Sequence, residues 1–366
     1  MKRIDEAGNL DGKRVLVRVD FNVPLKNGIV QESFRIEKAF QTIDYILERG
    51  GKAILASHFE GEGGTLAPIA AYLSSRYKIH FVKSYFPEIS ELQSEDKEVI
   101  LLENTRLYSG EKENSDVFAK HLALFADIYV NEAFPSSHRA HASIVGIPKY
   151  IPGFAGFSFM KEIEELSKAL HPNHPFVFIL GGAKFETKLP LIEKFFTIAD
   201  TVFIGGALAN DFLKARGFEV GKSLVSNKIH GIEKFTGEKI QIPMDVVVSR
   251  NGTRQEISVS ETEKNDVIVD VGPKTIELLA DKIRNAKSIL WNGPLGNFEN
   301  GYKESTLNLA KIIAQSSGES IVGGGDTVAS IAELGLTDSF TFISAGGGAM
   351  LEFLANETLP GIEALQ

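Results

Sequence analysis

The sequence predicts an α/β protein of two domains, each with a parallel sheet covered by helices on both faces. The chain has 366 residues, which is long enough for two domains with ordinary cores. Runs rich in Val, Ile and Leu alternate with segments in which apolar residues recur at helical spacing, and this order is typical of parallel sheets. Most of the 34 glycines lie after residue 155, so we expect the two halves to differ in chemistry.

The composition predicts a soluble globular protein, with 43% hydrophobic and 24% charged residues. No apolar run approaches the ~18–20 residues of a membrane helix, and the opening MKRIDEAGNLDGK lacks the apolar core of a secretory signal. We therefore expect a cytoplasmic location and no membrane partner. The formal net charge of −9 argues against a nucleic-acid partner. Because cysteine is absent, disulfides and thiolate metal sites are excluded.

In the first half, four apolar runs predict strands. They are RVLVRVDF (14–21), KAILASH (52–58), VILLENTR (99–106) and DIYVNEAF (127–134). Between the first two runs, apolar residues recur at the spacing of a helix, at Ile36, Phe40, Ile43 and Leu47.

Six further apolar runs predict the strands of the second half. They are FVFILGG (176–182), TVFIGG (201–206), DVIVDVG (266–272), SILWNGP (288–294), SIVGGG (320–325) and FTFISAGGG (340–348). A helical stretch at about residues 158–170 lies between segments that contain Pro and Gly, which predicts that it joins the two domains.

Arginines stand where the predicted strands of the first half end. Arg18 and Arg106 close two of these strands, Arg139 follows a third, and Arg35 opens a helix. Ligands of open parallel sheets bind beyond the carboxyl ends of the strands, and guanidinium groups match carboxylates and phosphates. A surface position would explain any one arginine alone, but together they predict a site for a small, highly anionic substrate.

Histidines accompany these arginines. His58 ends a strand and so shares their edge of the sheet. His138 and His141 have a spacing that suggests a metal site, but no third ligand is evident, and an anion-binding or structural role is favoured for His138.

Glycine turns of the second half predict sites for phosphate, because glycine lets backbone N–H groups approach an anion at a helix start. The two triple-glycine runs, 323–325 and 346–348, each close an apolar run and precede a helix-like segment. Lys184 and Lys188 follow another glycine pair, one helical turn apart, where like charges repel by ~0.2–0.5 kcal/mol unless an anion lies between them. Two solvated lysines are the alternative.

Acidic residues near these turns offer further contacts. Glu299 follows the rigid turn after Asn292 and suits ribose hydroxyls, although a surface position is the alternative. Asp326 stands at a helix start, as an ordinary N-cap or as a Mg²⁺ ligand beside bound phosphates.

Two nucleotide-binding motifs are rejected. GFEVGKS (217–223) is one residue shorter than a P-loop and follows a helix-like segment instead of a strand. Neither triple-glycine run contains G-x-G-x-x-G, which argues against a dinucleotide-dependent dehydrogenase.

In this order, seven segments resemble the phosphoglycerate kinase family over essentially the whole chain. They are RVDFNVP, LLENTRLYSGEKEN, YVNEAF with HRAHAS, ILGGAK, WNGP, GGGDT, and SAGGGAMLEFL with LPGIEAL. The resemblance implies two Rossmann-like three-layer domains with parallel sheets, joined by an interdomain helix. It implies a phosphoglycerate-binding domain (1–157), the helix (158–171), a nucleotide-binding domain (172–348) and a C-terminal segment (349–366) that returns to the first domain.

The same resemblance implies roles for individual residues. Those implied to bind phosphoglycerate are Asp20, Asn22, Arg35, His58, Arg106 and Arg139, with Arg18 and His138 adding positive potential. Those implied to line the nucleotide site are Gly182, Ala183, Lys188, Gly206, Asn292, Pro294, Glu299, Gly323, Gly324, Gly325, Asp326 and Thr327. Asp326 is implied to bind magnesium. Lys184 and Arg35 are implied to face the transferred phosphoryl group, with the N–H groups of Gly325 and Gly348.

The chain departs from the family pattern in two blocks and is shorter than most members. Glu60 and Gly61 stand where glycine and arginine are expected, and Ala345 and Met350 replace two hydroxyl residues. We expect the remaining arginines to suffice for substrate binding.

The implied reaction is reversible, Mg²⁺-dependent phosphoryl transfer from 1,3-bisphosphoglycerate to ADP, which gives 3-phosphoglycerate and ATP in glycolysis and gluconeogenesis. Substrates on different domains imply domain closure, and we expect a monomer. The alternatives are a catalytically weakened, nucleotide-binding relative of this kinase and a nicotinamide-dependent dehydrogenase.

Overall fold

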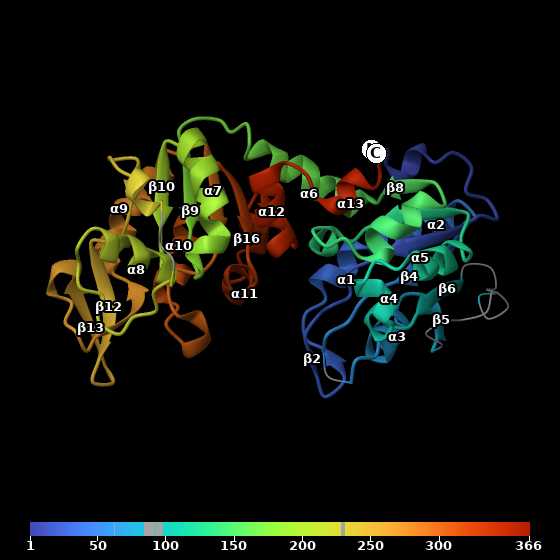
Figure 1. The fold of residues 1–366 in the computed structure, drawn as a ribbon, viewed down its shortest axis with the longest axis horizontal. Helices are drawn as coiled ribbons and strands as arrows, with labels where there is room; N and C mark the ends of the chain where they lie inside the picture. The colour runs from blue at the N-terminus through green and yellow to red at the C-terminus, as the bar shows by residue number, and fades with distance from the viewer. Residues whose placement is uncertain (62, 84–91, 93–97, 228–230) are drawn as a thin grey trace. The chain divides into compact units, whose positions relative to one another are not determined.

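The computed structural model describes residues 1–61, 63–83, 92, 98–227 and 231–366, and forms two compact units. The first unit comprises Met1–Glu164 and Asn356–Gln366, and the second comprises Glu165–Ala355. Each unit is built on a six-stranded sheet whose described pairings are all parallel, and helices flank each sheet in Figure 1. The predicted α/β class with parallel sheets is confirmed.

The sheet of the first unit has the order β5-β6-β4-β1-β7-β8. Its strands are β1 Arg14–Arg18, β4 Lys52–Ala56, β5 Lys78–Val82, β6 Glu98–Leu102, β7 Ile128–Asn131 and β8 Gly153–Ala155. From the central β1 the chain builds one side of the sheet and then returns to β7 on the other side. The strand order therefore reverses beside β1, where ligands of such sheets bind.

The helices of the first unit are α1 Phe34–Lys38, α2 Phe40–Glu48, α3 Ala67–Leu73, α4 Ser109–Lys112, α5 Asp116–Ala123, α6 Phe157–Lys168, which continues into the second unit, and α13 Pro360–Glu363. The helix predicted from Ile36 to Leu47 is in fact two helices, α1 and α2, separated at Ala39. Ile36, Ile43 and Ile46 form its fully buried face. The prediction of helical structure with an apolar face is therefore confirmed, but the interruption of the helix at Ala39 was not predicted.

Short elements complete the first unit. They are the hairpin of β2 Leu25–Lys26 and β3 Ile29–Val30, the 3-10 turns η1 Ile4–Glu6, η3 Thr105–Leu107, η4 Phe134–Ser136 and η6 Ile147–Lys149, and the π-helical turn η5 Ala142–Gly146. The C-terminal segment is tied to this unit where Gly361 N donates to Ser137 O at 2.9 Å.

The parallel sheet of the second unit has the order β11-β10-β9-β15-β16-β17. Its strands are β9 Phe176–Leu180, β10 Thr201–Ile204, β11 Ile240–Gln241, β15 Ser288–Asn292, β16 Glu319–Gly323 and β17 Phe342–Ile343. The helices are α7 Phe185–Ile198, α8 Gly206–Ala215, α9 Pro273–Arg284, α10 Glu304–Ala314, α11 Gly325–Glu333 and α12 Gly348–Asn356. Every residue of β9 and β15 is buried, as the continuous apolar runs predicted for strands covered on both faces. The 3-10 turns of this unit are η7 Ile232–Lys234, η8 Val259–Glu261, η9 Phe298–Asn300 and η10 Thr337–Ser339.

The second unit also contains an antiparallel sheet that the sequence analysis missed. It consists of β12 Asp245–Arg250, β13 Thr253–Ser258 and β14 Val267–Val271, in the order β13-β12-β14. The run at 266–272 was expected in a parallel sheet, and this is a correction. The sequence contained the signal, because Asn251–Gly252 joins β12 to β13 and both residues have positive φ (53° and 78°), as a two-residue hairpin requires.

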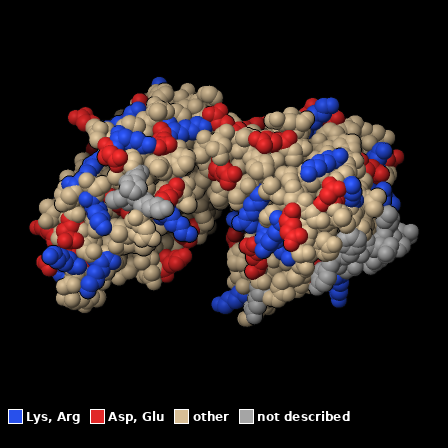
Figure 2. Space-filling view, in the orientation of Figure 1, with Lys and Arg blue, Asp and Glu red and all other residues tan. Residues whose placement is uncertain are grey.

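Figure 2 shows basic and acidic side chains interspersed over the visible face of the molecule. Within the described residues, no helix combines the length and apolar character that crossing a membrane requires.

Candidate active site

In the first unit, five cationic or histidine side chains gather at one edge of the sheet: three at or just after the ends of β1, β4 and β6, one from α1 and one from the segment after β7. We call Arg18, Arg35, His58, Arg106 and Arg139 the basic cluster. Electrostatic coupling links His58 to three of the arginines, and polar contacts join Arg35 and Arg106 through Asn22 and Glu60. Residues far apart in sequence thus meet at the edge that the strand pattern predicted.

Arg18 is fully buried at the end of β1 and already has protein partners. Its Nε donates to Ser143 Oγ at 2.7 Å, and its Nη2 lies 3.2 Å from His58 Nδ1. Ser143 Oγ in turn donates to the buried Glu111 carboxylate at 2.6 Å. Arg18 therefore adds positive charge from beneath the cluster. The sequence analysis did not single out Glu111 or Ser143, although both lie in segments that resemble the family, because nothing in the local pattern shows that they contact Arg18.

His58 is buried among positive charges. Burial, followed by Arg18, Arg106 and Arg139, lowers the pKa of His58 to about 2. The ring is consequently neutral near pH 7. Because an Arg18 donor faces Nδ1, the Nε2 atom carries the proton and is a donor.

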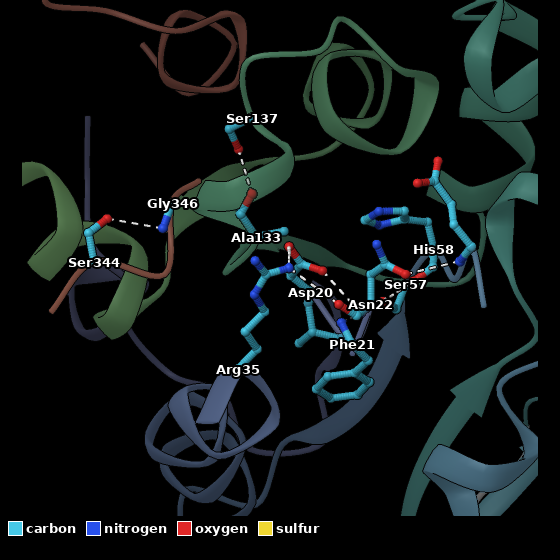
Figure 3. A network of polar contacts seen from close by, with 12 residues as sticks. Asp20, Phe21, Asn22, Arg35, Ser57, His58, Ala133, Ser137, Ser344 and Gly346 are labelled. Carbon is cyan, nitrogen blue, oxygen red and sulfur yellow. Dashed lines mark hydrogen bonds and ion pairs between the residues drawn. The ribbon is translucent and has the colours of Figure 1, made fainter. Parts of the chain in front are cut away.

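Arg35 reaches back from α1 to the turn after β1, as Figure 3 shows. Its Nη1 lies 3.2 Å from Asn22 O and 3.9 Å from Asp20 Oδ2. Asn22 N donates to Asp20 Oδ1 at 3.1 Å, so the carboxylate orders the turn as well as the guanidinium. The side chain of Arg35 remains 31% exposed, which leaves its other donors accessible to a ligand.

Arg106 is held at the end of β6 by Asn104, a residue that the sequence analysis did not single out. Asn104 Oδ1 accepts from Arg106 N and from Phe59 N, both at 3.0 Å. The Arg106 side chain is 7% exposed, and its Nη1 contacts Glu60 Oε1 at 2.6 Å. Its Nε and Nη2 are buried and have no hydrogen-bond partner among the described residues.

Arg139 and the two neighbouring histidines complete this edge. Arg139 is 43% exposed, its Nε lies 3.2 Å from His138 Nε2, and its Nη1 lies 4.0 Å from Glu60 Oε1. Burial is the main cause that lowers the pKa of His141 to about 4, so this ring is also neutral near pH 7. No set of three or more potential metal ligands occurs in the part of the chain that the structure describes, so the histidine pair has no third ligand there.

In the second unit, glycine turns interlock at the carboxyl ends of β9, β10 and β15. Gly182 N donates to Pro294 O at 2.9 Å, and Leu208 N donates to Gly182 O at 3.0 Å. Gly206 has a φ of 63°, and a Cβ there would lie 2.5 Å from Gly182 N. Only glycine fits at this crossing, where three of the predicted nucleotide-binding residues meet, namely Gly182, Gly206 and Pro294.

Lys184 has left-handed backbone angles, φ 67° and ψ 77°, and precedes α7 instead of belonging to it. The expected pair of lysines on one helix is therefore wrong. Lys188 lies inside α7, where burial lowers its pKa to about 8 and its Nζ donates to Gly181 O. Lys184 is exposed, and a strained non-glycine residue of this kind is a common feature of functional sites.

A cavity of about 360 Å³ lies beside these turns. Its apolar walls include Leu213, Val246 and Leu295. The predicted nucleotide residues that line it are Gly182, Ala183, Gly206, Pro294, Glu299 and Asp326. The other predicted nucleotide residues are not among its lining residues, namely Lys188, Asn292, Gly323, Gly324, Gly325 and Thr327.

Two polar residues of the cavity were missed by the sequence analysis. Asn210 Nδ2 donates to Leu224 O at 3.0 Å, and its Oδ1 is buried without a hydrogen-bond partner among the described residues. Burial raises the pKa of Asp270 to about 6, although Ser305 N, 3.2 Å from Oδ2, favours the charged form. Both side chains add polar groups to a lining that also includes Glu299 and Asp326.

The end of β16 leads directly into α11 through Gly324, whose φ is 103°. Thr327 Oγ1 is buried and has no hydrogen-bond partner among the described residues. Burial, and then the charge of Glu299, raises the pKa of Asp326, so a cation would relieve a real electrostatic cost there.

Asn292 lies close to the turn from β16 into α11. Its Nδ2 lies 3.8 Å from Met350 Sδ, and a Cβ on Gly323 would lie 2.1 Å from that sulfur. Met350 therefore fills the space beneath Gly323. After β17, Ser344 Oγ accepts from Gly346 N at 3.0 Å and orders the turn before Gly348 (Figure 3).

Comparison with known proteins shows one match over nearly the whole chain. The family model described as phosphoglycerate kinase matches residues 4–357. The chain belongs to the phosphoglycerate kinase family. A phosphoglycerate kinase of Dictyoglomus turgidum is 44% identical over 98% of this chain and 96% of its own length. One of Finegoldia magna is 40% identical over 98% and 97%.

Solved phosphoglycerate kinase structures have the same fold. The structure from Coxiella burnetii has a TM-score of 0.85 and 36% sequence identity, and covers 98% of this chain and 96% of its own. The structure from Pyrococcus horikoshii has a TM-score of 0.88 and 32% identity, with coverage of 100% and 98%. The predicted Rossmann-like fold class is confirmed.

Membership of the phosphoglycerate kinase family makes the chain an enzyme, a phosphotransferase of glycolysis that uses a carboxyl group as acceptor. ADP and ATP are nucleotide substrates of this family. The dehydrogenase alternative is wrong, and nothing in the comparisons favours the catalytically weakened relative.

Proposed function

We propose that the basic cluster binds 3-phosphoglycerate or 1,3-bisphosphoglycerate, and that the cavity of the second unit binds ADP or ATP with Mg²⁺. The observation that carries this assignment is the contrast between the two sheet edges. One edge presents guanidinium groups, and two buried donors of Arg106 have no partner among the described residues. The other edge presents glycine turns beside a largely apolar cavity. A small, highly charged triose suits the first edge, and a base with a phosphate chain suits the second.

Phosphoryl transfer then proceeds without a strong general base. An oxygen of the terminal phosphate of ADP forms a bond to the phosphorus of the acyl phosphate, and the bond from that phosphorus to the acyl oxygen breaks. The leaving group is a carboxylate, which needs no proton. The protein's contribution is alignment and stabilisation of the charge on the transferred group.

Lys184 and Arg35 are proposed to supply that stabilisation, together with N–H groups at Gly325 and Gly348. Lys184 is exposed at the start of α7, and Arg35 keeps donors accessible after bonding to Asn22. Gly325 and Gly348 are the first residues of α11 and α12, where backbone N–H groups have no carbonyl partner within the helix.

Asp326 is proposed to hold the magnesium ion. Its raised pKa shows that burial and Glu299 penalise its negative charge, and no hydrogen bond to its carboxylate occurs among the described residues. A single carboxylate fits, because nucleotide-bound Mg²⁺ takes one or two protein carboxylates and otherwise uses phosphates and water. When bound, the ion would neutralise phosphate charge. Thr327 Oγ1 is proposed to donate to a nucleotide phosphate.

We also propose that the enzyme is a cytoplasmic monomer that binds no nucleic acid. Size-exclusion chromatography with light scattering tests the monomer, and a mass of twice 40.0 kDa would reject it.

The direct test of the function is a coupled assay that follows ATP consumption with 3-phosphoglycerate and MgCl₂. We expect saturable turnover that requires both substrates. ATP consumption independent of 3-phosphoglycerate, or none at all, would reject the proposal. Isothermal titration with each substrate alone separates failure of binding from failure of transfer.

A further inference from the structure

Glu60 puts a carboxylate into the basic cluster. Its Oε1 lies 2.6 Å from Arg106 Nη1 and 4.0 Å from Arg139 Nη1. The two side chains of the shorter contact differ in burial, because that of Arg106 is 7% exposed and that of Glu60 is 50% exposed. A half-exposed anion thus faces a guanidinium that is largely removed from water.

The backbone of the segment around Glu60 is anchored on both sides. Glu60 N donates to Asn22 Oδ1 at 3.0 Å. Asn104 Nδ2 donates to Phe59 O and to Gly64 O, both at 2.7 Å. Phe59 is 2% exposed and fixes the segment to the core of the first unit. The hydrogen-bonded backbone at Phe59 and Glu60 therefore holds the carboxylate beside the arginines, while half of the Glu60 side chain remains exposed to solvent.

Arg106 still lacks acceptors when Glu60 is bound. Arg106 Nη1 donates to Glu60 Oε1, but Nε and Nη2 are buried without a partner in the described part of the structure. One carboxylate oxygen thus satisfies only part of a guanidinium that can bind a phosphate or carboxylate through two parallel bonds. An incoming oxyanion that engages more of these donors is able to replace Glu60.

We propose that Glu60 is an internal competitor for the triose substrate, which must displace this carboxylate from Arg106 and Arg139. This inference rests on the proposed substrate site. Glu60 then sets the affinity of the site for phosphoglycerate, lowering it in the resting enzyme and returning to the arginines as product leaves. It has no effect on the nucleotide site.

The test compares the wild-type protein with Glu60→Gln by isothermal titration, using inorganic sulfate and 3-phosphoglycerate as separate probes. Glutamine keeps the size of the side chain and removes its charge. We expect both probes to bind about three- to tenfold more tightly to Glu60→Gln, because the Glu60 carboxylate is half-exposed and its coupling to the arginines is modest. The KM for 3-phosphoglycerate should fall by a similar factor, and the KM for ATP should not change.

Glu113→Gln is the matched control, since Glu113 is exposed in the same unit and the substitution changes the net charge equally. Tighter binding in Glu60→Gln alone supports the inference. Equal gains in both variants would show a general charge effect and reject it. Unchanged or weaker binding in Glu60→Gln, repeated in Glu60→Ala, would show that Glu60 positions the arginines for substrate and would also reject it. The sulfate titration stands even if the wild-type enzyme fails to turn over 3-phosphoglycerate, so the two proposals fail separately.

Discussion

Single arginines of the basic cluster differ in how many of their donors already have partners. Arg18 is fully buried and bonded to Ser143, with His58 beside it, so it acts on substrate only through its charge and through His58. Arg106 keeps two donors that have no partner among the described residues, and Arg35 keeps donors that are accessible to a ligand. The proposal of direct substrate binding by Arg35 and Arg106, with support from Arg18, rests on this difference.

Lys184 gives a prediction at the same scale. We expect Lys184→Ala to lower kcat by about 100-fold or more, because a charge that meets the transferred phosphoryl group stabilises mainly the transition state. The KM for ATP should change by less than about threefold. Steady-state kinetics of the coupled reaction measures both quantities.

Lys264→Ala is the control, since Lys264 is an exposed lysine of the same unit that is not among the residues lining the cavity. Its kinetics should match the wild type. Equal losses in kcat and in ATP affinity for Lys184→Ala would show that Lys184 only binds nucleotide.

Among the elements, α6 has an unusual start. Glu132, at the end of β7, is buried and accepts from Ser158 N at 3.0 Å and from Phe159 N at 2.9 Å. Thr42 Oγ1 of α2 donates to the same carboxylate at 2.6 Å. One side chain thus satisfies the first N–H groups of α6 and ties the helix to the sheet.

Glu132 predicts a pH dependence of stability. Burial raises its pKa from 4.5 to about 7. The folded protein therefore binds this proton more tightly than the unfolded chain, so the contribution of Glu132 to stability is greatest below about pH 4.5 and is lost as the pH rises to about 7. The contribution lost is about 3 kcal/mol as an order of magnitude. Urea unfolding of wild type and Glu132→Gln across this range measures it.

We expect Glu132→Gln to flatten this part of the pH profile, while the exposed Glu164→Gln keeps it. An identical slope in wild type and Glu132→Gln would assign the titration to another group.

The hairpin of β12 and β13 gives a second prediction for an element. Gly252 has a φ of 78°, and a Cβ there would meet no atom within 4 Å. Gly252→Ala should therefore destabilise the protein through backbone strain alone, by about 1 kcal/mol. Gly252→Asn should recover part of the loss, because asparagine tolerates this conformation. Urea denaturation compares the three proteins, and equal stability of Gly252→Ala and wild type would contradict the strain argument.

For the whole molecule, the sequence predicted the strands and the candidate site residues that follow directly after an apolar run. Arg18 and Gly182 were found because apolar runs end just before them, and parallel strands bring their carboxyl ends to one edge. Pairings across long sequence distances were not predictable. Glu60 meets Arg106 across 46 residues, and Glu132 meets Phe159 across 27, and no periodic pattern marks either contact.

Backbone conformation also escaped prediction. The spacing of Lys184 and Lys188 predicted that both lie on one helix, but Lys184 has a left-handed φ and precedes α7. Asn251–Gly252 is a clear hairpin signal, but the alternation of strands and helices along the chain predicted only parallel sheets.

A prediction for the whole molecule concerns metal removal. No cluster of three or more His, Asp or Glu ligands exists among the residues the structure describes, and Asp326 offers one carboxylate. EDTA should therefore abolish turnover and leave the melting temperature of the nucleotide-free protein unchanged. Turnover that persists in EDTA would contradict the magnesium proposal. A fall in melting temperature would indicate a structural metal.

Trp291 is the chain's single tryptophan, and it lies fully buried in β15 with its Nε1 donating to Gly293 O at 3.0 Å. Indole emission from this protein consequently originates entirely in the second unit, next to the turn that lines the cavity. Tryptophan fluorescence will therefore report ligand binding in the second unit. A titration without a change in this fluorescence gives no information about binding at the basic cluster of the first unit. Tyrosines, dispersed through the first unit, are the chromophores to watch for that half instead.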